Sequence, residues 1–287
     1  MPDVHTTRLR QARWAGWASV VANIGIVVTG GAVRLTGSGL GCPTWPRCTD
    51  ESFTPHGELE FHSAIEFGNR LLTFVLVAVA VLLFVAALRT GRRELVRLSV
   101  LLGLGIPMQA VIGGITVLTD LNSWIVSLHL LLSLGLVALS VRFLQVLDRP
   151  VPPARGPAVA LAWGVVATAW VVFYLGTIVT GAGPHAGDAA TERNGLDPAQ
   201  WSQLHADAVF LLLGLTVGLV VTLLVQRAPR PAVQAALVLL GLELAQGTIG
   251  FVQYFTDLPV LLVGLHLLGA AVLSASVTWT LLRVRHP

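Results

Sequence analysis

Residues 63–88 read SAIEFGNRLLTFVLVAVAVLLFVAAL, and this stretch decides the class of fold. Its last part, residues 71–88, contains no charged side chain. A helix needs about 20 mostly apolar residues to cross the hydrocarbon core of a bilayer. The stretch therefore predicts a membrane-spanning helix whose polar side chains, Glu66, Asn69 and Arg70, lie near one end.

Composition extends this prediction to the whole chain. Hydrophobic residues make up 54% of the 287 residues and charged residues only 11%, far from the balance of a water-soluble domain. Runs of the same kind predict eight spans, at residues 14–33, 63–88, 97–118, 124–147, 158–181, 204–226, 233–255 and 260–282. We therefore expect an all-α membrane protein surrounded by a lipid bilayer.

The basic residues predict how the chain crosses the membrane. All 18 are arginine, and they form short clusters between apolar runs instead of one basic face, which argues against nucleic acid as a partner. Most of them fall before the first span and in the connections after the second, fourth, sixth and eighth spans. The positive-inside rule then puts both termini in the cytoplasm of a multi-pass cell-membrane protein. The two long connections, 34–61 and 182–203, are expected on the outer side.

An internal repeat divides the chain into two halves, 1–150 and 151–287. The short sequence Leu-His-Leu-Leu occurs at 128–131 and again at 265–268, and Thr-Asp-Leu occurs at 119–121 and 256–258. Repeats in membrane proteins commonly carry equivalent binding sites. We expect two four-helix bundles related by a pseudo-twofold axis along the membrane normal.

Three histidines lie inside predicted spans: His129, His205 and His266, each about one turn from the outer end of its helix. Ionisable groups inside a membrane are functional candidates by default. Imidazoles that face one another across a bundle are the usual ligands of a haem iron, so we expect a bis-histidine haem held by His205 and His266. The alternative for any one of them is a packing role, in a hydrogen bond to a neighbouring helix.

The repeat breaks at one ligand position. Asn69 occupies the place that corresponds to His205, and asparagine is a poor ligand for haem iron. A site in the first half would thus have His129 on one side of the iron and a weak or open position on the other. His62 lies on the same helical face about two turns further out, so we expect it at the outer rim, in contact with a proton or a propionate.

Glu66 lies one turn from Asn69, and its counterpart in the second half is Ser202. A carboxylate found only in the half with the open position is a candidate base during an oxidation. The structural alternative is a salt bridge to Arg70. Arg70 and Arg34 are candidate partners of haem propionates, because guanidinium groups suit carboxylates.

Both cysteines, Cys42 and Cys48, lie in the first outer connection. On the oxidising side of a membrane such a pair is expected to form a disulfide. Its role is either to staple a glycine-rich loop or, as a reducible bond beside a haem site, to pass electrons. Two cysteines without a nearby histidine pair make a zinc site unlikely.

These residues together resemble a known family. The segment TGGAVRLTGSGL at 29–40, the cysteine loop, EFGNR at 66–70 and the histidines of the fourth, sixth and eighth spans are similar to those of the haem A synthases. The resemblance covers nearly the whole chain, and the glycine-rich segment with its cysteines is the most specific part.

The resemblance implies that haem O is oxidised at a ring methyl, by successive hydroxylations, to the formyl group of haem A. It also implies that a haem b is held in the second half, that Glu66 is catalytic and that the cysteines assist. A haem O synthase is a possible partner, and the electron acceptor is left open. The sequence departs from the common Glu-x-x-His-Arg order at Asn69, which puts in doubt a mechanism with two histidines on the substrate haem.

Two other functions fit parts of the pattern. A cytochrome b that transfers electrons would use two bis-histidine sites, and Asn69 argues against the second of these. A transporter built on a repeat would show a pair of broken helices, whereas only Pro107 interrupts a span.

Overall fold

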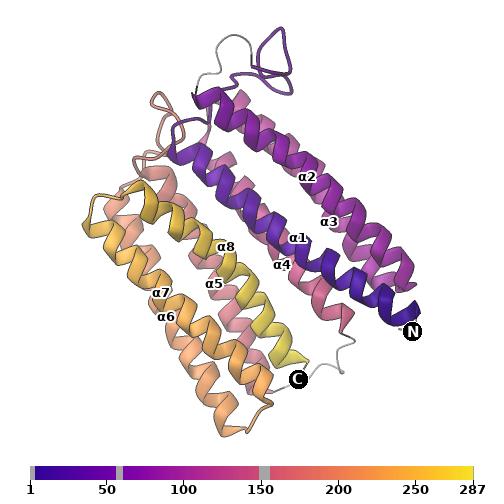
Figure 1. The fold of residues 1–287 in the computed structure, drawn as a ribbon. Coiled ribbons are helices and arrows are strands. Elements are labelled where there is room, and N and C mark those ends of the chain that lie inside the picture. The colour runs from indigo at the N-terminus through magenta and orange to yellow at the C-terminus, as the bar shows by residue number, and fades with distance from the viewer. Residues whose placement is uncertain (1–3, 56–60, 149–155, 287) are drawn as a thin grey trace.

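The computed structural model describes residues 4–55, 61–148 and 156–286, and eight helices make up most of these residues (Figure 1). They are α1 (Val4–Leu35), α2 (Phe61–Thr90), α3 (Arg93–Leu118), α4 (Ser123–Leu147), α5 (Pro157–Ala182), α6 (Pro198–Val225), α7 (Arg230–Phe255) and α8 (Val260–Arg285). All eight are long and apolar enough to cross a membrane. The prediction of an all-α, eight-span membrane protein is confirmed.

Helices α1 and α6 start furthest before the apolar runs that predict them. Helix α1 begins at Val4 instead of residue 14, and its added turns bring Arg13 to 2.7 Å from the carboxylate of Asp148. Helix α6 begins at Pro198 instead of 204, because Asp197 caps it by accepting a hydrogen bond from the amide of Ala199. Hydropathy finds only the apolar part of a helix, so polar first turns are missed.

The first four helices pack on one another, as do the last four. Helices α1, α4, α5 and α8 lie in the middle of the molecule, where α1 contacts α8 and α4 contacts both α5 and α8. Helices α2 and α3 cover one flank of this central group, and α6 and α7 cover the other (Figure 1). Two four-helix groups are therefore present. The pseudo-twofold axis stays a prediction, and the boundary near residue 150 lies outside the described residues.

Small residues let the central helices approach closely. A Cβ on Gly16 of α1 would lie 2.6 Å from the side chain of Leu144 in α4, and one on Gly31 would lie 2.0 Å from Leu267 in α8. Neither distance is compatible with a larger residue unless the leucine moves. This pattern of small residues at helix contacts is common in membranes, where close packing replaces the hydrophobic effect.

The repeat is visible in the backbone of two turns. Asp120 and Leu121 between α3 and α4 have φ angles of 50° and 61°, and Asp257 and Leu258 between α7 and α8 have 59° and 56°. In each turn the leucine amide donates to the carbonyl five residues earlier, at 2.7 Å and 2.8 Å. Leucine seldom adopts this left-handed conformation. Its occurrence at both matching positions supports the equivalence of these segments.

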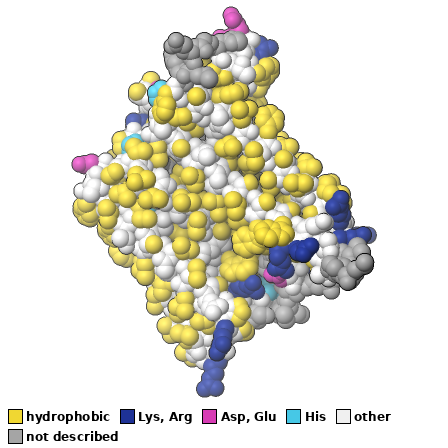
Figure 2. Space-filling model, in the orientation of Figure 1, with side chains coloured by type: hydrophobic (Ala, Val, Ile, Leu, Met, Phe, Trp, Pro, Cys, Tyr) yellow, Lys and Arg dark blue, Asp and Glu magenta, His cyan; other side chains and the backbone are white. Residues whose placement is uncertain are grey.

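The two long connections lie at one end of the molecule, here called the loop end, and the two chain termini lie toward the other, the termini end (Figure 1). Hydrophobic side chains dominate the face in Figure 2, and arginines gather toward the termini end. At the loop end Arg34 of α1 joins the halves, since it donates to the carbonyls of His185 at 2.6 Å and Thr180 at 2.9 Å.

Candidate functional site

The clearest pairing among the predicted residues is between α6 and α8. The ring centres of His205 and His266 are 6.5 Å apart, and their planes are inclined at 73°. Each ring lies against a glycine of a neighbouring helix: a Cβ on Gly176 would be 3.1 Å from His205, and one on Gly250 would be 3.5 Å from His266. Glycine at these positions leaves room for both imidazoles inside the bundle.

This separation fits an iron held between two imidazoles. With a metal–imidazole bond of about 2.0–2.1 Å, the centres of two axial rings lie roughly 6 Å apart. Nδ1 of His266 is buried and has no hydrogen-bond partner among the described residues, which is costly for a polar atom unless something else satisfies it. No cluster of three or more His, Cys, Asp or Glu side chains that could hold a metal ion occurs in the same residues. The two facing imidazoles are the donor set of a bis-histidine haem site.

His129 in α4 has the same local setting without a facing imidazole. It lies against Gly113 of α3, where a Cβ would be 3.3 Å from its ring. Gln109 fixes this turn by donating to the carbonyl of His129 at 3.1 Å and to the hydroxyl of Ser133 at 2.6 Å. Nδ1 of His129 is buried without a partner in the part of the chain that the structure describes.

Depth along the helices is similar for all three histidines. His129 is the seventh residue of α4, His205 the eighth of α6 and His266 the seventh of α8. They therefore lie nearly two turns inside the helix ends instead of the one turn expected. For His205 the difference follows from the polar first turn of α6. Helices α4 and α8 begin within one residue of the predicted starts, so His129 and His266 lie deeper than one turn by those starts as well.

Asn69 is the ninth residue of α2, at a depth close to that of His205 in α6. Its amide nitrogen would lie 4.0 Å from a Cβ on Gly30, so the side chain faces α1. Its Oδ1 is buried and unpartnered among the described residues, where it makes no hydrogen bond with His129. The two halves thus differ at this position, as the sequence indicates.

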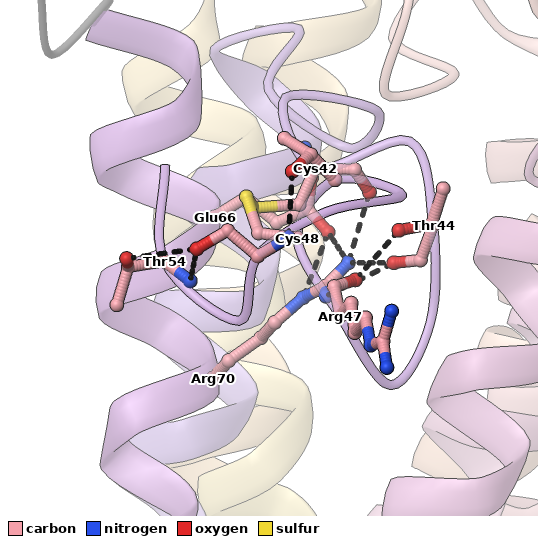
Figure 3. Close-up of a disulfide and its surroundings, with 9 residues drawn as sticks. Cys42, Thr44, Arg47, Cys48, Thr54, Glu66 and Arg70 are labelled. Carbon is pink, nitrogen blue, oxygen red and sulfur yellow. Dashed lines mark hydrogen bonds and ion pairs between the residues drawn. A yellow bond between two sulfur atoms is a disulfide. The ribbon is translucent and has the colours of Figure 1, made fainter. Parts of the chain in front are cut away.

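Glu66 is buried at the loop end of α2, with 5% of its surface exposed. Its carboxylate accepts a hydrogen bond from the amide of Cys42 at 2.7 Å and forms a salt bridge with Arg70, whose Nε is 3.1 Å away (Figure 3). The salt bridge considered from the sequence is therefore present. A role in proton transfer stays a prediction.

Arg70 points from α2 into the cysteine loop (Figure 3). Besides Glu66, its guanidinium donates to the carbonyls of Cys42 at 2.9 Å, Thr44 at 3.1 Å and Arg47 at 3.1 Å. All three guanidinium nitrogens of Arg70 thus donate hydrogen bonds within the protein, and two of those of Arg34 do the same. Contact of either arginine with a propionate stays a prediction, and both have a clear structural role in holding the outer connections.

Cys42 and Cys48 form a disulfide, as predicted (Figure 3). Both side chains are buried, so the bond is not the exposed one that a short surface loop suggests. The loop is packed down on two helices: a Cβ on Gly41 would be 2.5 Å from the carbonyl of His62, and one on Gly114 of α3 would be 2.3 Å from the ring of Trp45. The loop is a fixed part of the site.

We predict that joint replacement of Cys42 and Cys48 by serine lowers the free energy of unfolding by about 2 kcal/mol, because the cross-link no longer restricts the unfolded chain. The thermal midpoint in detergent measures this change. Mass spectrometry of unreduced, alkylated protein tests the pairing itself, and two labelled thiols in the parent protein would contradict it.

His62 lies at the rim, as predicted. Its ring is exposed, and its Nδ1 is 2.9 Å from the hydroxyl of Ser38. It borders an open pocket of about 390 Å³ between the first connection and Asp188 of the other long connection. His62 is one turn nearer the loop end of α2 than Glu66, and its contact with a proton or a propionate stays a prediction.

These features define a multi-pass helical membrane protein that carries three histidines at a similar depth within its helices. The chain belongs to the COX15-CtaA family of cytochrome oxidase assembly proteins, whose model matches residues 12–207. A protein named heme A synthase from Caulobacter sp. (strain K31) is 29% identical over 94% of this chain and 96% of its own length.

Other relatives match shorter parts. A heme A synthase from Geobacillus thermodenitrificans is 32% identical over 42% of this chain, and the match spans only 37% of that relative. A protein named protoheme IX farnesyltransferase from Halobacterium salinarum (strain ATCC 29341 / DSM 671 / R1) is 30% identical over 42% of this chain, which is 26% of its own length. Of these two names, heme A synthase is also the name of the relative that matches nearly the whole chain.

Proposed function

We propose that this protein is a haem A synthase, an oxidoreductase that converts a ring methyl of haem O into the formyl group of haem A by successive hydroxylations. The family and the Caulobacter relative support this. The observation that carries the proposal is the difference between the halves, since His205 and His266 form a pair and His129 does not. Two strong ligands suit electron transfer, whereas a free position suits chemistry at the substrate.

Residue roles follow from this difference. In the second half, residues 151–287, His205 and His266 hold a haem b, which supplies one-electron transfer when bound. In the first half, residues 1–150, His129 binds the substrate haem O. Asn69 leaves the opposite side of that substrate without a strong ligand.

Glu66 is proposed to accept a proton at the reacting edge of the substrate. Its carboxylate is held by the Cys42 amide and by Arg70, so its direction is fixed before the substrate arrives. We propose that the disulfide serves this geometry by fixing the Cys42 amide. Its burial supports this role over electron transfer, because a reductant must first displace the loop to reach the sulfur atoms.

The distribution of arginine supports a definite topology. Helices reach the termini end close to Arg92, Arg142, Arg230 and Arg283, so we propose that this end faces the cytoplasm of a cell membrane. The loop end, with Glu66 and the disulfide, then faces the outer aqueous phase. Cysteine oxidation and proton release both suit that side.

A haem O synthase is the proposed supplier of substrate. A relative named for farnesyl transfer to protohaem contains a segment similar to this chain, which makes up about a quarter of its length. Two activities that share a reaction sequence gain from being close, because a hydrophobic haem then need not leave the bilayer. The electron acceptor is a further partner of unspecified chemistry.

The proposal is tested in a bacterial strain that makes haem O and lacks its own haem A synthase. Expression of this chain is expected to yield a formyl haem, identified by chromatography of extracted haems and by the pyridine haemochrome spectrum. If the membranes contain the protein with bound haem b but the extract contains only haem b and haem O, the activity is refuted. That result would favour an electron-transfer cytochrome.

We predict that Asn69→His lowers haem A formation by no more than about tenfold, less than the about 10²–10⁴-fold expected for loss of a general base. The new imidazole competes for the free side of the substrate iron without removing any group that takes part in proton transfer. Asn69→Ala is the control, since it removes the amide without adding a ligand. Complete loss of haem A in the histidine variant alone would show that this side must stay open.

A further inference from the structure

Glu243 is a second buried carboxyl group, and it lies in the middle of α7 between Arg230 and Phe255. Only 2% of its surface is exposed. The hydroxyl of Thr216 in α6 donates to its Oε1 at 2.9 Å, and Oε2 has no partner among the described residues. An acidic side chain at membrane depth is rare and marks a functional position.

No other charged group of the neighbouring elements contacts it. Helix α7 packs against α6 and α8. Within these three helices the other titratable or charged side chains lie toward the ends, namely His205, Asp207, Arg230, Tyr254, His266, Arg283 and Arg285. None of them forms a hydrogen bond or ion pair with Glu243 in the described structure. The charge of Glu243 is therefore set by whether the carboxyl binds a proton, and this depends on the charge of any cofactor that the bundle holds.

Glu243 lies on the same face of α7 as the contact with His266. Gly250, against which the His266 ring lies, is seven residues away, which is two helical turns or about 10 Å along the axis. Between them, Gln246 lies against Gly269 of α8, where a Cβ would be 1.5 Å from its amide nitrogen. Gln246 thus places a second polar side chain on this face of α7, between the carboxyl and the contact with His266.

The carboxyl belongs to one half only. By the offset that pairs His266 with His129 in the internal repeat, the residue of the first half that corresponds to Glu243 is Ile106, a buried apolar side chain. The second half therefore has a buried acid at a position where the first half has an apolar side chain, and Glu66, the buried acid of the first half, lies at a different place, in α2.

We propose that Glu243 takes up one proton when the second half gains one electron, and releases it when the electron leaves. This inference rests on the proposed haem b between His205 and His266. An added electron raises the negative charge of a low-dielectric bundle, and protonation of a carboxylate cancels it. The electron comes from a one-electron donor, which is oxidised, and would be held by the haem b, which is reduced. The proton comes from a hydronium ion of the solvent, whose O–H bond breaks as an O–H bond forms on the carboxylate of Glu243.

The test is a redox titration of the purified, haem-loaded protein at several pH values, with dithionite as reductant. The midpoint potential of the parent is expected to fall with rising pH, by up to about 59 mV for each tenfold change in proton activity. Glu243→Gln should make the potential independent of pH. Glu94→Gln, which alters an exposed glutamate paired with Arg142, is the matched control and should keep the parental slope.

Infrared difference spectroscopy of the parent, reduced minus oxidised, gives a second measurement if Glu243→Gln fails to retain haem. A carboxyl C=O band that moves in Thr216→Val supports the proposal, because only that hydroxyl bonds the carboxyl in the described structure. Absence of the band, or a parental slope in Glu243→Gln, overturns it even where haem A is still made. If the parent makes no haem A, the synthase activity is refuted, but a potential that depends on pH in the parent and not in Glu243→Gln still supports the role of Glu243. If the parent binds no haem b, both proposals are overturned.

Discussion

Replacement of either His205 or His266 by alanine is expected to reduce the haem b that co-purifies with the protein at least about tenfold, since loss even of groups that support a metal ligand costs 10–100-fold in affinity. Each side chain supplies one of the two strong bonds in the second half. The ring-centre separation of 6.5 Å leaves space for an iron between them and for little else. The low-spin haem absorbance per mole of purified protein measures the loss.

His185→Ala is the matched control. His185 also lies toward the loop end, where its Nε2 is 2.9 Å from the carbonyl of Leu258, but it is in a connection and outside the paired site. This variant is expected to keep its haem b even if its thermal midpoint falls. If His205→Ala or His266→Ala kept the parental low-spin haem absorbance per mole of protein, the two histidines would not be the axial ligands of haem b.

The number and class of the helices could be predicted because each span is a long apolar run, a property of local composition. The first residues of α1 and α6 could not be predicted from apolar runs, because their first turns are polar. In α6 the signal was nevertheless present, as an aspartate followed by proline at 197–198, which caps and starts a helix. Reading this cap together with hydropathy would also have set the depth of His205 correctly.

The candidate site was predictable where it follows the repeat. The break at Asn69 and the pairing of His205 with His266 depend on matching two stretches of one sequence, and the structure keeps that match in the turns at Asp120 and Asp257. The disulfide followed from its compartment alone. These inferences need no knowledge of how the loop folds.

The packing of the cysteine loop was not predictable, because it depends on contacts between residues far apart in the chain. The sequence makes Arg70 a candidate partner of a propionate, whereas in the structure its nitrogens bind carbonyls of the loop. Trp45 was not singled out, although it occupies the space left by Gly114. Glu243 was also missed, and there the signal was plain, since a carboxylate in the middle of an apolar run seldom lacks a function.

Glu66→Ala is expected to retain haem b and to lower haem A formation by about 100-fold or more, in the range for removal of a general base. Haem O or a hydroxylated intermediate should accumulate, which chromatography of extracted haems detects. The second half should be unaffected, because the carboxylate contacts the cysteine loop and Arg70 and not the paired histidines.

The structure also gives Glu66 a supporting role, and two further variants separate that role from proton transfer. Glu66→Gln keeps an oxygen that can accept from the Cys42 amide, but it cannot take up a proton. Arg70→Ala removes the guanidinium that joins Glu66 to the loop and leaves the carboxylate in place. If Glu66 accepts a proton, Glu66→Gln should be nearly as inactive as Glu66→Ala, while Arg70→Ala keeps measurable haem A formation with a lower thermal midpoint. Activity close to the parent in Glu66→Gln, together with inactive Arg70→Ala, would instead make Glu66 a positioning residue that acts by holding the loop.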